Sequence, residues 1–265
     1  MGSKMRSTAA TKTMRYACPR TRENLAVDGN LGEETWNAAE RSTLFSDHTG
    51  ARALFDTTAA IAWDDHGLYI GFWLEDRDIQ AVQEEASHEV RQDSHVGVLV
   101  TGPGAYYDLA VNPLGATSEM FYIWKEAYRD DARFDAPEFD LAVHRPEVLG
   151  GHTRTDIRAM RWAFSDWKFP GLQAGVKVDG DPGRRDRVDR GWTVELALPW
   201  DGLKLLADGQ SVPPTIGDVW RIGLVRRQVI DQRGHRWQAT WTWQPLALVD
   251  GLMPETHLEL ELAGS

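Results

Sequence analysis

Three tryptophans occupy alternate positions of one predicted strand near the C-terminal end of the sequence, RWQATWTW. Trp237, Trp241 and Trp243 are separated by even numbers of residues, and alternate side chains of a strand point to the same face. A row of aromatic rings on a sheet face can hold sugar rings or flat apolar ligands. Trp124 lies on another predicted strand and would extend such a row. Most of the twelve tryptophans are nevertheless expected in the core.

Polar side chains near the predicted strands would complete a ligand site. Asn112, Asp108 and Arg226 offer the amide, carboxylate and guanidinium groups that orient a bound ring through hydrogen bonds. Arg91 and His95 lie around the start of a further predicted strand. These two side chains would suit a catalyst that needs one or two positioned acid, base or hydrogen-bonding groups.

Two acidic clusters are candidate calcium sites, because calcium prefers oxygen ligands. They are Asp64 with Asp65, and Glu75 with Asp76 and Asp78. Solvated carboxylates in turns are the alternative interpretation. Calcium bound around Asp64 and Asp76 would be structural, and its removal would lower the melting temperature. No cofactor is required by this interpretation.

The linear motifs of common enzymes are absent from the sequence. It contains no GxSxG, no HExxH, no glycine-rich phosphate loop and no CxxC. Any catalysis would therefore depend on a shaped pocket rather than on a recognisable local motif.

Strand patterns recur from residue 52 to the C-terminus, and turn sequences such as TGPGA, NPLGA and PPTIGD separate them. This spacing predicts an all-β fold, an antiparallel β-sandwich of jelly-roll-like type. Short helices are expected at 33–40 and 200–207, and a long irregular insertion at 130–169. The predicted strands follow a hairpin at 58–79 and cover 94–101, 105–111, 119–125, 173–178, 191–198, 219–229, 236–243 and 257–262.

The second strand of the hairpin, GLYIGFWLE, is apolar on both faces. A strand with only one buried side would alternate apolar with polar residues. One face is expected against the second sheet of the sandwich. The other face is expected either beneath the 130–170 segment or in the ligand groove.

The overall composition is that of one globular domain of 265 residues, with 42% hydrophobic and 26% charged residues. The net charge of −11 argues against nucleic-acid binding, which needs a basic surface. Cys18 is the sole cysteine, so no intrachain disulfide can form.

Residues 1–23 are interpreted as a disordered basic leader, with an inert cysteine in it, and residues 24–265 as the folded domain. No signal peptide is recognisable, and no run of eighteen apolar residues predicts a membrane span. The expected location is cytoplasmic, with a carbohydrate or small-molecule ligand and neither a nucleic acid nor a membrane as partner.

Five ordered motifs, followed by a closing MPETHLEL (253–260), resemble the family 9 carbohydrate-binding modules and their stand-alone bacterial relatives. The resemblance covers about residues 24–263 and implies a β-sandwich with a sugar-binding concave face and, in some members, structural calcium. The motifs are VDGNLGEETW (27–36), AWDDHGLYIGF (62–72), YYDLAVNPLG (106–115), GWTVELALPW (191–200) and GDVWRIGLVRR (217–227).

The sugar-gripping positions that the resemblance implies are largely replaced. The family's tryptophan falls at Arg91, its strand glutamate at Gly97, and a charged residue at Ala110, whereas Asn112 is retained. These replacements imply a shallower and roomier face. Family resemblance alone does not transfer function when the site residues have changed.

Three functions remain open from the sequence. The first is a non-catalytic module that binds a sugar or another ring-containing small molecule on an aromatic-lined concave face. The second is an intracellular isomerase or cyclase of specialised metabolism that uses the remodelled pocket. The third, a haem-binding relative, would need an axial pair such as Met120 with a histidine, and nothing in the sequence pairs them.

Overall fold

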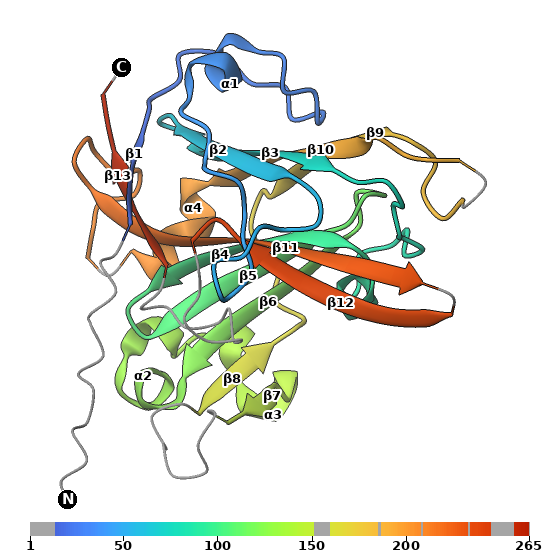
Figure 1. Cartoon of the computed structure of the whole chain (residues 1–265). Coiled ribbons are helices and arrows are strands. Elements are labelled where there is room, and N and C mark those ends of the chain that lie inside the picture. Colours follow the sequence, from blue (N-terminus) through green and yellow to red (C-terminus); the bar gives the residue numbers. More distant parts are fainter. Residues whose placement is uncertain are drawn as a thin grey trace, which may run out of the picture.

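The computed structural model describes residues 14–150, 160–184, 187–207, 209–232, 234–244 and 257–264. Within these ranges the chain forms two β-sheets that pack face to face (Figure 1). Neighbouring strands are antiparallel, apart from one parallel pair at an edge of the larger sheet. The predicted antiparallel β-sandwich is confirmed.

The larger sheet has nine strands among the described residues, and β11 is the longest of them. β11 pairs with β13 through its first residues, with β4 along its middle and with β12 through its second half. In sheet order the strands are β1 (Arg15–Cys18), β13 (Leu258–Leu262), β11 (Val219–Gln232), β4 (His95–Gly102), β5 (Ala105–Val111), β6 (Thr117–Trp124), β8 (Arg161–Phe164) and β7 (Glu147–Leu149), with β12 (His235–Thr242) paired to β11.

The smaller sheet has four strands in the part of the chain that the structure describes. In sheet order they are β2 (Thr57–Trp63), β3 (Gly67–Glu75), β10 (Gly191–Pro199) and β9 (Gln173–Asp179). The helices are short and lie in the connections: α1 (Glu34–Ala38), η1 (His88–Gln92), α2 (Lys125–Asp130), η2 (Ala132–Phe134), η3 (Pro137–Phe139), α3 (Leu141–His144), α4 (Trp200–Leu203) and η5 (Lys204–Leu206).

The core lies between the two sheets and follows from strand alternation. On β3 the even-numbered residues from Leu68 to Leu74 are buried in the main apolar cluster, and on β4 the even-numbered residues from Val96 to Val100 join them. Side chains of a strand alternate between its faces, so each sheet contributes one apolar face to this cluster.

The second face of β3 is covered by the N-terminal segment 25–39, which includes α1 (Figure 1). Tyr69 of β3 packs there in a separate apolar cluster with Leu31 and Trp36. At Gly71 a β-carbon would come within 3.1 Å of Leu31 and 3.2 Å of Trp36, so the glycine allows this close approach. The alternative that the 130–170 segment covers this face is therefore wrong.

Part of the predicted leader is a strand. β1 pairs in parallel with β13 at the edge of the larger sheet, and its burial alternates so that Tyr16 and Cys18 face the core. The prediction of disorder is wrong from Met14 to Glu23, because alternate apolar side chains anchor this segment. Burial raises the pKa of the Cys18 thiol well above its usual range, which keeps it protonated. The first thirteen residues lie outside the described ranges.

The predicted irregular insertion is partly regular. Its described residues include α3 and the strands β7 and β8, and β8 extends the larger sheet beyond β6. Polar and charged residues around β7 and β8 interrupt the strand pattern, so the sequence did not predict these two strands. No helix in the described ranges is long and apolar enough to cross a membrane.

Candidate functional site

Two tryptophans of the predicted row, Trp241 of β12 and Trp243 just after it, face the core. Trp241 and Trp243 are only 5% and 7% exposed and belong to the main apolar cluster. The Trp243 ring meets Tyr16 edge-on at 5.1 Å between centroids. Trp237 is 45% exposed, on the part of the β11–β12 hairpin that has no β4 partner. The predicted open aromatic platform is therefore wrong for Trp241 and Trp243.

Arg226 lies in a buried polar network between the sheets. Its side chain and that of Asp76 are both 0% exposed, and Arg226 Nη2 lies 3.3 Å from Asp76 Oδ2. The guanidinium also donates to Thr57 Oγ1 at 2.7 Å and to Gln228 Oε1 at 2.6 and 3.0 Å. Burial lowers the pKa of Arg226 to about 10, although Asp76 opposes this shift. The ligand role predicted for Arg226 is wrong, because its donors are used internally.

Asn112 stabilises a turn. Its Oδ1 accepts backbone hydrogen bonds from Leu114 at 3.1 Å and Ala116 at 2.9 Å. Its Nδ2 donates to the Gln83 carbonyl at 2.7 Å and to Asp93 at 3.0 Å. Asn112 is fully buried. Its predicted contact with ligand is therefore wrong, and its retention in the motif is explained by the turn.

The predicted calcium ligands are separated by β3. Asp64 precedes the strand and Asp76 follows it, so at about 3.3 Å per residue they lie more than 25 Å apart. Asp64 accepts backbone hydrogen bonds from His66 and Gly67 and one from the Tyr69 hydroxyl. Asp76 is paired with Arg226. The two acidic clusters therefore do not form one site, and the Asp64 and Asp76 carboxylates both have partners within the chain.

A cluster of three carboxylate side chains, not predicted from the sequence, lies where the N-terminal segment meets β10. One carboxylate oxygen from each of Asp28, Glu33 and Glu195 lies within 4.8 Å of the other two. Both Glu195 oxygens accept hydrogen bonds, from the backbone of Asp28 and Gly29 at 3.2 and 3.3 Å and from Trp36 Nε1 at 3.0 Å. This contact joins the VDGNLGEETW and GWTVELALPW segments.

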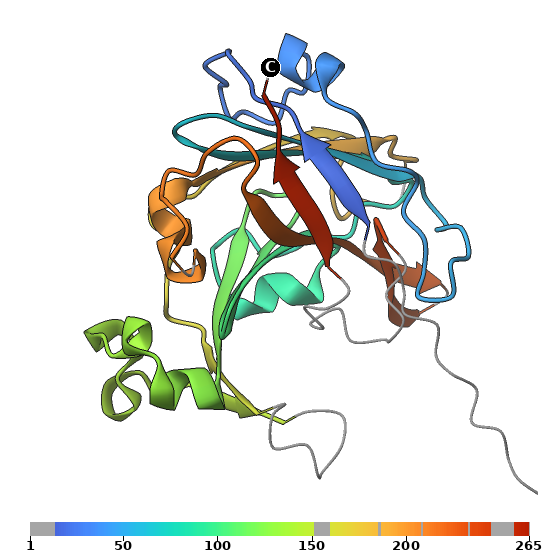
Figure 2. The same ribbon diagram turned by 90° about the vertical axis from the view of Figure 1, so that its left-hand side faces the viewer.

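The outer face of the nine-stranded sheet is concave, and η1 lies within the curve (Figure 2). This helix places Arg91 against β5 and β6. Arg91 Nη1 lies 2.9 Å from Asp108 Oδ2, and its Nε donates to Ser118 Oγ at 3.0 Å. Two residues predicted separately thus form one ion pair. The family's tryptophan position holds a guanidinium.

Aromatic rings continue this face towards the far end of β6. Tyr106 and Tyr122 stack with centroids 4.4 Å apart, and Trp124 follows at 5.9 Å from Tyr106. The Arg161 guanidinium lies between 5.3 and 5.9 Å from all three ring centroids. The sequence prediction missed both tyrosines. Strand alternation was the available signal, because Tyr106 adjoins the inward Tyr107 on β5 and Tyr122 adjoins the inward Phe121 on β6.

His95 lies buried at the start of β4. Its Nδ1 is 2.8 Å from the Asp93 carbonyl oxygen. Burial, aided by Arg91 and Arg227, lowers the pKa of His95 to about 4. His95 therefore stays neutral near pH 7 and is a poor proton acceptor at that pH.

The shifted pKa of His95 predicts an acid sensitivity of folding. As the pH falls below about 6.5, the unfolded chain binds a proton at this histidine before the folded chain does, so stability present above that pH is lost down to about pH 4. The loss attributable to this residue is about 3 kcal/mol in the free energy of unfolding. Urea denaturation between pH 4 and 7 measures it.

The matched comparison uses two histidine variants. His95→Gln is expected to flatten the dependence of unfolding free energy on pH, whereas His88→Gln, at an exposed position of η1, leaves the dependence unchanged. Equal slopes for the wild type and His95→Gln would contradict the assignment.

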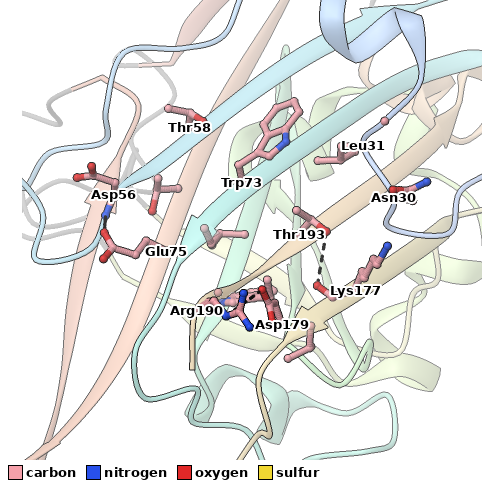
Figure 3. Close-up of a pocket in the computed structure, with 16 residues that line it drawn as sticks. Asn30, Leu31, Asp56, Thr58, Trp73, Glu75, Lys177, Asp179, Arg190 and Thr193 are labelled. Atoms are coloured by element: carbon pink, nitrogen blue, oxygen red, sulfur yellow. Dashed lines mark hydrogen bonds and ion pairs between the residues drawn. The ribbon is translucent and has the colours of Figure 1, made fainter. Parts of the chain in front are cut away.

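A groove of about 730 Å³ lies over the outer face of the four-stranded sheet (Figure 3). Trp73 of β3, Thr193 of β10 and Lys177 of β9 contribute to its lining. Residues 30–32 form a wall, and Arg190 lies beside Asp179 (Figure 3). From the sequence, the second face of β3 was expected either beneath the 130–170 segment or in a ligand groove, and Trp73 on that face does line a groove.

Solved structures share this architecture. A Bacteroides uniformis protein with a suggested carbohydrate-binding function superposes with a TM-score of 0.64 at 12% identity, over 95% of this chain and 100% of that chain. A family 9 carbohydrate-binding module from Caldicellulosiruptor kristjanssonii in complex with cellotriose has a TM-score of 0.54 at 14% identity, over 95% and 94% of the two chains. The fold is that of the family 9 carbohydrate-binding modules.

A second structure of a family 9 module from Caldicellulosiruptor kristjanssonii, in complex with glucose, has a TM-score of 0.53 at 14% identity, over 94% of this chain and 96% of that chain. No protein-family profile and no curated protein matches the sequence. The family 9 fold predicted from the motifs is therefore confirmed through tertiary structure. At these identities the likeness establishes the fold alone.

Proposed function

We propose that the protein binds carbohydrate, without catalysing a reaction, on the concave outer face of the nine-stranded sheet. The observation that carries this proposal is a row of side chains over β5 and β6, in which the Arg91–Asp108 pair at one end is followed by aromatic rings. Two of these rings, Tyr106 and Tyr122, are buried, and Trp124 is partly exposed. Polar groups that orient hydroxyls and rings that stack on sugars are the two requirements of such a site.

Arg91 and Asp108 are the hydrogen-bonding end of the proposed site. The Arg91 side chain is 20% exposed, and its guanidinium donates to Asp108 Oδ2, to Ser118 Oγ and to the carbonyls of both residues. Of the five N–H donors of an arginine, one is then left for a ligand hydroxyl. The hydrogen bonds to Asp108 and Ser118 hold the guanidinium in place before ligand binds, which reduces the entropic cost of ordering this side chain on binding.

Trp124 is the stacking end. It is partly exposed and lines a cavity of about 480 Å³ together with Thr101 and Arg221. It lies six positions along β6 from Ser118, the partner of Arg91, which corresponds to about 20 Å. This length favours a chain of several sugar rings over a monosaccharide.

The lowered pKa of His95 favours a binding function over acid–base catalysis. An isomerase or cyclase would need a positioned proton donor or acceptor whose pKa is near the working pH. Burial holds the pKa of His95 at about 4, and its Nδ1 lies at the Asp93 carbonyl. His95 is therefore proposed as a packing residue beneath the face and not as a catalyst.

Replacing Trp124 by alanine is expected to weaken binding of a soluble oligosaccharide by roughly 10- to 100-fold, because the stacking surface is lost. Asp108→Asn should weaken it by roughly tenfold, because the carboxylate no longer fixes Arg91. Isothermal titration calorimetry measures both, beginning with cellotriose and extending to xylan and mannan oligosaccharides.

Trp237→Ala is the matched control. Trp237 points to the opposite side of the hairpin from Gln238, whose amide contacts the Arg91 carbonyl at 3.0 Å. This variant should bind like the wild type. Unchanged affinity in Trp124→Ala, with an unchanged melting temperature, would reject the concave face as the site. Failure of every oligosaccharide to bind would reject the ligand class.

A further inference from the structure

We infer that the groove over the four-stranded sheet is a second binding site, for a neutral ligand rich in hydroxyl groups, of the carbohydrate class. It lies on the outer face of the sheet opposite the proposed concave site, so the whole core separates the two (Figures 1 and 3). Its volume of about 730 Å³ lies in the usual range for small-molecule sites, about 300–1,000 Å³.

The groove is built from side chains that strand alternation directs away from the core. On β3 and β10 the inward residues Leu74 and Trp192 are buried, whereas Trp73 and Thr193 stand on the outer face and line the groove. Lys177 occupies the same face of β9. An ordinary solvent-facing sheet would carry no wall, but here residues 30–32 rise beside it.

This wall is fixed by internal contacts. Thr193 Oγ1 donates to the Gly29 carbonyl at 2.6 Å, and Glu195 accepts from the Gly29 amide at 3.3 Å. Gly29 has a φ of +83°, and a β-carbon there would come within 2.7 Å of the Val176–Lys177 backbone. Because only glycine permits this approach, the wall stands close to β9 before any ligand arrives, and binding does not have to order it.

Trp73 supplies an aromatic surface of fixed orientation. Its ring meets Trp36 edge-on at 6.3 Å, and the Arg41 guanidinium lies 3.8 Å from its centroid. Arg41 thus occupies one face of the indole, and it is Trp73 and not Arg41 that lines the groove. A clamped, partly exposed tryptophan is suited to stacking on the apolar face of a sugar ring.

The charges around the groove favour a neutral ligand. Lys177 and Arg190 are positive, whereas Asp56, Glu75 and Asp179 are negative. A phosphate or polyanion would meet three carboxylates, and a cation would meet the two basic groups. A hydroxyl group both donates and accepts hydrogen bonds, so a polyol is the ligand that uses both signs.

Lys177 is the side chain best placed to contact such a ligand. Asp56 is paired with Arg52, Glu75 with Arg77, and Asp179 with Arg190 at 3.5 Å. In the described part of the chain, no carboxylate lies within ion-pair distance of the Lys177 ammonium, which stands exposed on an edge strand. Its three donors are available to ligand oxygens.

Calorimetry on the full chain tests the inference with the same oligosaccharides, cellotriose, xylotriose and mannotriose. The groove is expected to add a binding event that Trp73→Ala weakens at least tenfold and Lys177→Ala about threefold to tenfold. Lys177→Ala changes an exposed edge position, so it remains informative if Trp73→Ala does not fold. Lys204→Ala, at an exposed lysine of η5, is the matched control and should bind like the wild type.

The variants separate this inference from the concave-face proposal. Loss of all binding in Trp124→Ala, with no change in Trp73→Ala or Lys177→Ala, would overturn the groove and leave the concave face standing. Loss of all binding in the groove variants alone would support the groove and reject the concave face. Binding by none of the three sugars would overturn the groove as a carbohydrate site.

Discussion

Replacing Arg226 by alanine is expected to lower the free energy of unfolding by about 3–5 kcal/mol. Arg226 and Asp76 form an ion pair with no exposed surface, and Thr57 and Gln228 complete its hydrogen bonds. Removal of the guanidinium leaves the Asp76 carboxylate buried without its charge partner, and the desolvation cost of that charge is no longer offset. Urea denaturation at pH 7 measures the loss.

Two further variants test the reason given for this loss. Arg221→Ala removes an exposed arginine from the same strand and should change stability by less than about 0.5 kcal/mol. The double variant Arg226→Met with Asp76→Leu removes both charges and should recover much of the loss, because no unpaired charge remains. A double variant no more stable than Arg226→Ala would show that packing, and not the charge, dominates.

Replacing Trp243 by alanine is expected to cost about 3–5 kcal/mol of unfolding free energy, because a large buried side chain leaves a cavity. Trp243 is 7% exposed and packs on Tyr16 of β1, so the variant should also loosen the N-terminal strand. Chemical denaturation and hydrogen exchange of residues 15–18 report the two effects. Sugar binding at the concave face should persist in the folded fraction.

Trp237→Ala provides the comparison for Trp243. Both tryptophans lie on one face of the same hairpin region, but Trp237 is 45% exposed and its loss leaves no cavity. It should change stability by less than about 0.5 kcal/mol. If Trp243→Ala retained full stability and instead lost ligand affinity, Trp243 would belong to a binding site and its placement in the core would be rejected.

The sheet face on which each candidate residue lies decides whether its side chain can contact a ligand. Arg91, Asp108 and Trp124 lie on the concave outer face, whereas Trp241 and Arg226 lie inside the sandwich. Even-numbered residues of β12 reach the concave side, where Gln238 contacts the Arg91 carbonyl. The face of β12 that was predicted to bind ligand, the tryptophan face, is therefore opposite to the face on the concave side.

The sequence by itself determined the sandwich, most strand positions and the grouping of side chains on strand faces. Strand alternation and turn chemistry are local properties, and they placed β4, β5, β9 and β10 within a few residues of their observed bounds.

Only the tertiary structure decided which face of each strand is buried. Alternation places Trp237, Trp241 and Trp243 on one face of their strand but does not say whether that face is buried. A sheet face becomes inner or outer only when the second sheet packs on it. The same holds for Arg226, which was predicted to contact ligand. Its guanidinium is instead buried with Asp76, which lies at the end of a distant strand. The groove beside Trp73 exists because residues 25–39 fold back over β3, a long-range packing event that no local pattern encodes.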